Sequence, residues 1–203
     1  MKKIVFALSV ILTVAIMAFT NDTGYAVGDY ATDFKLKNVD GKMVSLADMK
    51  DAKGYIVIFT CNHCPYSKAY EDRIIDLQKK YGKAGYPVIA INPNDPGVAP
   101  DDSFEKMQER AKQKKFNFPY LYDATQEIAK TYGASRTPHV YILQKEAEGK
   151  YKVAYIGAID NDTENNSKDK EKYVENAIAA LQKGQQPNPS STKAIGCTIK
   201  WKK

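Results

Sequence analysis

A Cys-x-x-Cys sequence stands between an apolar run and an amphipathic segment, and this junction constrains the fold more than any other stretch of the chain. Residues 55–59 are apolar, Cys61 and Cys64 follow, and apolar residues recur at three- and four-residue spacing from Pro65 to Tyr81. This pattern predicts a buried strand that leads into a helix with one buried face. Pro65 is acceptable in the first turn of that helix. The junction therefore predicts a dithiol at the start of a helix.

Such a dithiol is suited to redox chemistry. Free N–H groups and the helix dipole favour a thiolate on the first sulfur, so we expect the pKa of Cys61 to fall from about 8.5 towards roughly 3.5 to 7.5. Cys64, one turn further on, would then resolve a mixed disulfide by bonding to Cys61. The alternatives are a structural disulfide or half of a metal site, although a structural zinc site needs four ligands and the chain has no second cysteine pair.

His63 lies between the two cysteines. A partly charged imidazole there would stabilise the Cys61 thiolate and raise the reduction potential. A solvated loop histidine with little effect is the alternative.

Composition supports one globular domain. The chain has 203 residues, of which 43% are hydrophobic, and its three cysteines are too few for a disulfide-stapled scaffold. The net charge is +6, but the lysines are scattered among acidic residues, which indicates a solvated surface and no nucleic-acid partner.

The amino terminus has the pattern of an export signal. Lys2 and Lys3 precede sixteen uncharged residues, 4–19, and this run is short for a spanning helix of about 20 residues. We therefore predict a cleaved signal peptide over residues 1–26, with small residues at Gly24-Tyr25-Ala26 and a weaker cleavage candidate at residues 18–20. The mature chain would be periplasmic or otherwise extracytoplasmic, and it would meet a membrane only through the signal segment if that were retained.

The remaining chain predicts alternating strands and helices. A hairpin is expected from residues 31–36 and 43–46, with strands at 87–91, 118–122, 140–143 and 151–156, the last two antiparallel. Asp101 or Asp102 is expected to cap a helix that runs to about Phe116, and further helices are expected over 125–132 and 173–181. The polar segment 160–169 is predicted to be mobile, 92–100 is either a wall of the site or an ordinary connection, and 184–203 is a tail.

The chain resembles the thioredoxin superfamily from about Val27 to Leu181. Residues 27–34 with Asp40-Gly41-Lys42 are similar to the N-terminal segment of the domain in the peroxiredoxin and redoxin branch of this superfamily. Residues 59–65 together with Gly196–Trp201 are similar to peroxiredoxin-like proteins that carry a Cys-x-x-Cys. The resemblance implies an α/β thioredoxin-like fold, with a central mixed sheet flanked by helices and an N-terminal hairpin extension, over a domain at residues 27–183.

The resemblance also implies a site around Pro138, as the cis-proline that faces the dithiol. Thr137 would offer backbone groups to a substrate chain, and Arg136 would supply positive charge near the thiols. Two family features are missing: residues 55–60 hold no acidic residue, which leaves the proton acceptor for Cys64 unassigned, and Cys61 occupies the position of the peroxiredoxin threonine.

The sequence therefore predicts an exported thiol–disulfide oxidoreductase that uses no cofactor. Its partners would be protein thiols or disulfides and an unidentified redox partner protein, in a direction that the sequence leaves open. The alternatives are a thiol peroxidase and a copper-binding assembly factor that would use Cys61, Cys64 and His139, since thiolates and imidazole suit copper. His139 could equally pack or face outward.

With Cys197 the chain has three cysteines, an odd number for an exported protein, so one thiol is left over once the other two pair. It could act as a resolving or regulatory partner or form an intermolecular bridge. A quiet thiol beside Trp201 is the alternative.

Overall fold

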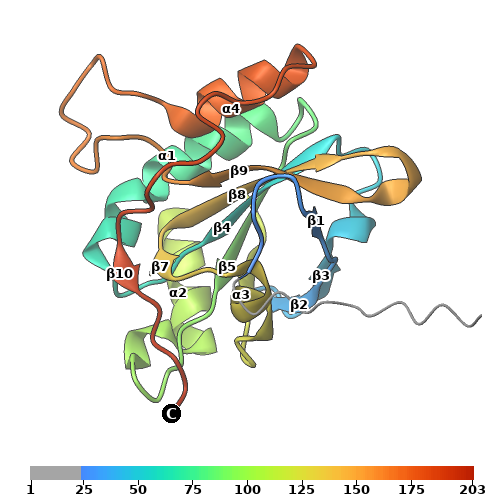
Figure 1. The fold of residues 1–203 in the computed structure, drawn as a ribbon. Helices are drawn as coiled ribbons and strands as arrows, with labels where there is room; N and C mark the ends of the chain where they lie inside the picture. The colour runs from blue at the N-terminus through green and yellow to red at the C-terminus, as the bar shows by residue number, and fades with distance from the viewer. Residues whose placement is uncertain (1–23) are drawn as a thin grey trace, which may run out of the picture.

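The computed structural model describes residues 24–203, so nearly all of the predicted signal peptide at 1–26 lies outside the described residues. Within them an eight-stranded mixed sheet has the order β1-β9-β8-β4-β5-β6-β2-β3 (Figure 1). Its strands are β1 (Tyr30–Ala31), β2 (Lys35–Asn38), β3 (Met43–Ser45), β4 (Gly54–Phe59), β5 (Val88–Asn92), β6 (Tyr120–Tyr122), β8 (His139–Lys145) and β9 (Tyr151–Gly157). The helices are α1 (Pro65–Tyr81), α2 (Phe104–Lys114), α3 (Glu127–Tyr132) and α4 (Tyr173–Gln182), and a second, two-stranded sheet joins β7 (Arg136–Thr137) to β10 (Cys197–Thr198).

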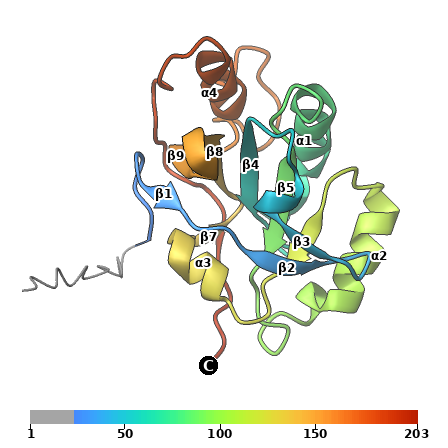
Figure 2. The same cartoon turned by 90° about the vertical axis from the view of Figure 1, so that its right-hand side faces the viewer.

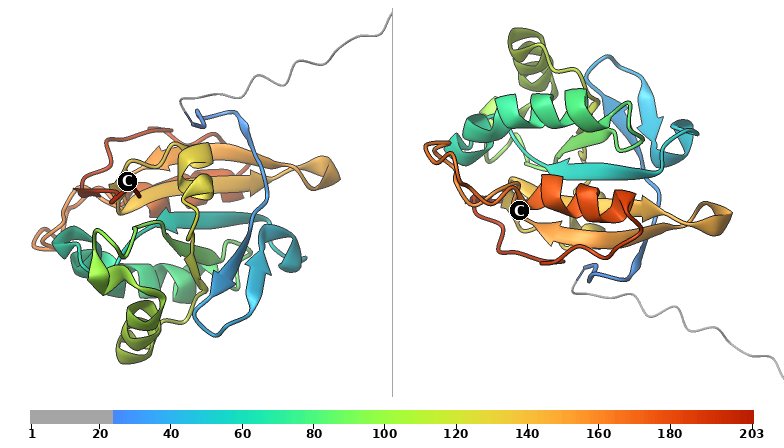
Figure 3. Two further views of the ribbon diagram at one scale, coloured as in Figure 1. Left: turned by 90° about the horizontal axis from the view of Figure 1, so that it is seen from below. Right: turned by 90° about the horizontal axis from the view of Figure 1, so that it is seen from above.

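Strand β4 lies inside the sheet, parallel to β5 and antiparallel to β8. Alternate residues of a strand face opposite sides of the sheet, and both sides of β4 are buried. Ile56 and Ile58 pack in one core with residues of α1 and α4, whereas Val57 and Phe59 pack in the other core with residues of α3. Helices thus cover both faces of the sheet (Figures 2 and 3), which confirms the predicted fold class.

The N-terminal hairpin is confirmed as β2 and β3, but the predicted strand at 31–36 is divided. β1 pairs with β9 at one edge of the sheet, and β2 pairs with β6 near the opposite edge. The chain between them crosses the sheet and buries Phe34 in the core that includes α3 residues. Burial of Phe34 therefore prevails over the alternating pattern that predicted one continuous strand.

The start predicted for the second helix is wrong. α2 begins at Phe104, and the side chain of Ser103 caps it by accepting a hydrogen bond from Lys106 N at 3.3 Å. Asp102 lies in a short 3₁₀ turn before the helix, and its carboxylate has other partners.

The segment 160–169, predicted to be mobile, is attached to α1. The guanidinium of Arg73 donates to both carboxylate oxygens of Asp160 at 2.8 and 2.7 Å and to the carbonyl oxygens of Asp162 and Thr163 at 2.6 and 2.7 Å. A single half-buried arginine therefore attaches a segment whose composition indicates mobility.

The predicted tail runs back over the domain. Ser191 forms a bridge with Ile156 of β9, and further on β10 pairs antiparallel with β7 (Figure 1). Among residues 24–203, no helix has the length and apolar character needed to span a bilayer.

Candidate active site

The two cysteines of the Cys-x-x-Cys sequence follow β4, but neither lies in the first turn of α1. Cys64 is the N-cap residue of the helix, and Cys61 precedes it in the connection. The expectation that both thiols lie on the first helical turn is therefore wrong, because the helix begins at Pro65 and both cysteines precede it.

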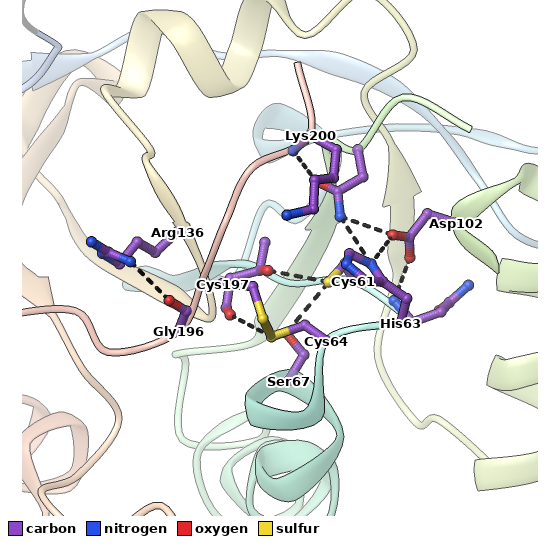
Figure 4. The surroundings of a disulfide bond; sticks show 12 residues. Cys61, His63, Cys64, Ser67, Asp102, Arg136, Gly196, Cys197 and Lys200 are labelled. Carbon is purple, nitrogen blue, oxygen red and sulfur yellow. Dashed lines mark hydrogen bonds and ion pairs between the residues drawn. A yellow bond between two sulfur atoms is a disulfide. The ribbon is translucent and has the colours of Figure 1, made fainter. Parts of the chain in front are cut away.

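Cys64 forms a disulfide with Cys197, across 133 residues of sequence, with their Cα atoms 6.1 Å apart (Figure 4). Cys61 remains a free thiol and is only 3% exposed. Cys197 is therefore bonded to a cysteine of the dithiol within the same chain, and it is neither an unreactive free thiol nor part of an intermolecular bridge in this structure.

Thr137 contacts both cysteines of the motif. Its hydroxyl oxygen lies 3.1 Å from Cys61 Sγ, and its carbonyl oxygen lies 3.3 Å from Cys64 Sγ. The bond from Thr137 to Pro138 is cis, which confirms that part of the expectation. The backbone of Thr137 is not free for a substrate, however, because it pairs with Cys197 of β10.

The pKa of Cys61 is raised from its ordinary value, and the prediction of a lowered pKa is wrong. Burial is the largest cause, and the negative charge of Asp102 is the second. Hydrogen bonds with the Thr137 hydroxyl, the Cys64 backbone and the Ser67 hydroxyl, the last at 3.7 Å, act in the opposite direction. A sulfur ahead of the helix and under the tail is desolvated more than it is stabilised.

Asp102 is the site residue that the sequence analysis missed. Its fully buried carboxylate lies 2.5 Å from His63 Nδ1 and accepts hydrogen bonds from Asn62 N, Asn92 Nδ2 and Asn94 Nδ2 at 2.5, 3.2 and 2.8 Å. Asn94 belongs to the loop expected as a candidate wall of the site. The sequence suggested Asp102 only as a helix cap, which would pair its carboxylate with N–H groups of α2. The carboxylate instead accepts from Asn62, Asn92 and Asn94.

Arg136 and His139 lie close to this region but do not contact the sulfur atoms in the predicted way. Arg136 donates to the carbonyl oxygen of Gly196 at 2.9 Å and so contacts the tail. His139 is buried against Tyr141, and burial, followed by the charge of Arg136, lowers its pKa to about 4. His139 is therefore neutral near pH 7 and packs in the core.

Three side chains could serve as metal ligands. Ligand atoms of Cys61, His63 and Asp102 all lie within 4.8 Å of one another, which offers sulfur, nitrogen and oxygen donors. The copper set considered from sequence, which combined Cys61 and Cys64 with His139, differs from this group. Cys64 is bonded to Cys197, and His139 is not a member.

The fold and site define a redoxin-like protein of the thioredoxin superfamily. The fold is shared with a thiol:disulfide interchange protein of Chlorobium tepidum TLS, at a TM-score of 0.52 and 22% identity over 66% of this chain and 87% of that one. Residues 27–155 match the AhpC/TSA family model, and the chain belongs to that family.

Two further comparisons extend over most of the chain. It is 28% identical over 144 residues to the thiol-disulfide oxidoreductase ResA of Geobacillus thermodenitrificans (strain NG80-2), which covers 70% of this chain and 75% of ResA. It is also similar to an uncharacterized conserved protein of Geobacillus kaustophilus, with a TM-score of 0.79 and 37% identity over 87% of this chain and 93% of that one.

Proposed function

We propose that this protein is a thiol–disulfide oxidoreductase that exchanges disulfides with protein substrates through Cys61 and Cys64. The observation that carries the proposal is a free Cys61 thiol that contacts Thr137, directly before the cis-proline Pro138, with Cys64 at the start of α1. The similarity to ResA supports the same class of reaction.

The reaction starts at Cys61, in a molecule whose Cys64 is reduced. The Cys61 thiolate attacks a substrate disulfide, forms a mixed disulfide and releases one substrate thiolate. Cys64 then attacks Cys61 Sγ, which releases the second substrate thiolate and leaves a Cys61–Cys64 disulfide. The reverse sequence oxidises a substrate dithiol with the same atoms, so the electron donor or acceptor sets the direction.

Hydroxyl groups around Cys61 support its thiolate. Thr137 Oγ1 at 3.1 Å and Ser67 Oγ at 3.7 Å can each donate to the negative sulfur. Such donors favour the charged form and offset part of the cost of burial.

His63 acts on this sulfur through its electrostatic surroundings. A protonated imidazole 2.5 Å from Asp102 neutralises part of the carboxylate charge that raises the pKa of Cys61. This refines the tuning role expected for His63, since the histidine acts by way of a buried carboxylate.

Export completes the proposal. Lys2 and Lys3 followed by the apolar run at 4–19 support a signal peptide, and the disulfide between Cys64 and Cys197 is compatible with an oxidising compartment. The protein would then work outside the cytoplasm on secreted or envelope proteins.

The decisive test is the variant Cys61→Ser. Because Cys61 is the thiol that attacks the substrate disulfide in the proposed reaction, we expect reduction of insulin by dithiothreitol to fall to the uncatalysed rate. Far-ultraviolet circular dichroism should match that of the unaltered protein, and retained catalysis by a folded Cys61→Ser protein would disprove the proposal.

A further inference from the structure

The C-terminal residues 196–202 lie beside the dithiol, in a seat that we define as the backbone of residues 135–138 together with Asn94, Asp95 and Gln126. Strand β10 pairs antiparallel with β7, with Cys197 opposite Thr137, and Ile199 N donates to Ser135 O at 3.2 Å. Ile199 is buried in the core that contains α3 residues. The tail therefore extends the edge that leads into Pro138.

The far end of this seat is formed by polar groups. Lys200 N donates to Asn94 Oδ1 at 2.8 Å, and Lys200 O accepts from Asp95 N and from Gln126 Nε2, each at 2.9 Å. Lys202 N donates to Gln126 Oε1 at 2.8 Å. Hydrogen bonds from two separate segments thus fix the tail beyond the disulfide.

Gly196 permits the tail to approach so closely. A Cβ atom at this position would stand 2.2 Å from the carbonyl oxygen of Thr137, 2.6 Å from its carbonyl carbon and 3.0 Å from Pro138 N. These are backbone atoms, which cannot turn away as a flexible side chain could. A glycine here is therefore a condition for placing Cys197 against Cys64.

The arrangement brings three sulfur atoms together around one residue. Cys61 Sγ contacts the Thr137 hydroxyl, Cys64 Sγ contacts the Thr137 carbonyl, and Cys197 is bonded to Cys64 (Figure 4). A thiolate next to a disulfide is the arrangement from which thiol–disulfide exchange proceeds.

We propose that Cys197 is a third redox-active cysteine, which passes its disulfide to the Cys61/Cys64 pair. In this step the Cys61 thiolate attacks Cys64 Sγ, the Cys61–Cys64 bond forms, the Cys64–Cys197 bond breaks, and Cys197 leaves as a thiolate that takes up a proton. The number of disulfides is unchanged, so the step needs no external oxidant or reductant.

The exchange also changes access to the site. While Cys64 is bonded to Cys197, β10 covers the edge of Thr137 and Cys61 is 3% exposed. Release of Cys197 removes the covalent link that holds the tail there. The tail thus supplies a thiol partner from the same chain and covers the backbone edge of Thr137 until the exchange releases it. This inference rests on the proposed function.

The test uses oxidised full-length protein, which holds one disulfide and one thiol among its three cysteines. It is incubated without added thiol over a range of pH, quenched in acid, denatured and labelled with N-ethylmaleimide, and the labelled cysteine is identified by mass spectrometry of a non-reducing digest. We expect label on Cys197 as well as on Cys61, reached at a rate that rises with pH and is independent of protein concentration.

Each other result has a defined meaning. Label on Cys61 alone at every pH and time, or exchange that depends on protein concentration, would overturn the relay. Insulin reduction by the same protein is measured in parallel, because its absence would refute the proposed function, whereas its presence without labelling of Cys197 would refute only the relay.

Gly196→Ala provides a variant that alters no sulfur atom. Displacement of the tail from Thr137 and Pro138 should increase the labelled fraction of Cys197 at least fivefold. Ile195→Ala, which changes an exposed neighbour, is the matched control and should leave that fraction unchanged. A Gly196→Ala protein that labels as the unaltered protein does would show that the seat does not hold the tail.

Discussion

Two buried carboxylates, Asp102 and Asp160, differ in their cationic partners. Asp160, 4% exposed, accepts hydrogen bonds on both oxygens from the permanently charged guanidinium of Arg73 and on Oδ1 also from Tyr70 and Asp162 N, and Lys170 Nζ lies 3.8 Å away. Asp102, 0% exposed, is bound by neutral amide groups and by the imidazole of His63.

The difference gives the two carboxylates different roles: Asp160 holds two parts of the chain together, and Asp102 acts on the reactive thiol. A carboxylate neutralised by arginine exerts little field beyond its partner, and here it attaches the segment 160–169 to α1. The carboxylate of Asp102 has no arginine or lysine partner, and its negative charge raises the pKa of Cys61. The first should therefore control stability, and the second the reactivity of the thiol.

The largest expected effect is that of Arg73→Met on stability. Removing the guanidinium leaves the buried Asp160 with the more distant Lys170 as its cation, so the free energy of unfolding should fall by about 3 to 5 kcal/mol. Urea denaturation measures this change. Lys79→Met, which breaks the exposed pair with Asp76, is the control and should change the free energy by less than about 1 kcal/mol.

The same variant tests the separation of roles. None of the charges that shift the pKa of Cys61 belongs to Arg73 or Asp160. The titration of Cys61 in folded Arg73→Met protein should therefore match that of the unaltered protein. A shift would show that the Arg73–Asp160 pair also influences the thiol.

These two carboxylates also mark what the sequence could and could not predict. Helix α1 and the strands on either side of it were predicted closely, because their signals are local periodicities of apolar residues. The attachment of Asp160 to Arg73, 87 residues away, has no local signal. Composition alone therefore suggested a mobile segment.

The site was predicted in the same partial way. Cys61, Cys64 and Pro138 follow from a motif and a resemblance, whereas the Cys64–Cys197 bond spans 133 residues and depends on the path of the tail. Asp102 was assigned to a cap because a helix start is a local pattern. Its true partners come from the Cys-x-x-Cys connection and from β5 with the loop that follows it.

A smaller effect is expected from Asp102→Asn on the thiol. The substitution removes a charge that raises the pKa of Cys61, so this pKa should fall while the cost of burial remains. Cys61 is the free thiol of the oxidised protein, and the pH profile of its alkylation by iodoacetamide, measured on the Cys61 peptide by mass spectrometry, reports the change. The midpoint should move to lower pH, and an unchanged midpoint would mean that burial alone sets the reactivity.

The smallest effect, and the sharpest test of how His63 acts, is that of His63→Gln. Glutamine can still donate an N–H group to Asp102 but cannot carry the positive charge of a protonated imidazole, so the carboxylate is neutralised less and the pKa of Cys61 should rise. The direction is opposite to that of Asp102→Asn. In the double variant with Asp102→Asn the effect of His63→Gln should vanish, because the histidine acts through the carboxylate. A full additive effect in that cycle would instead place the influence of His63 directly on the Cys61 sulfur.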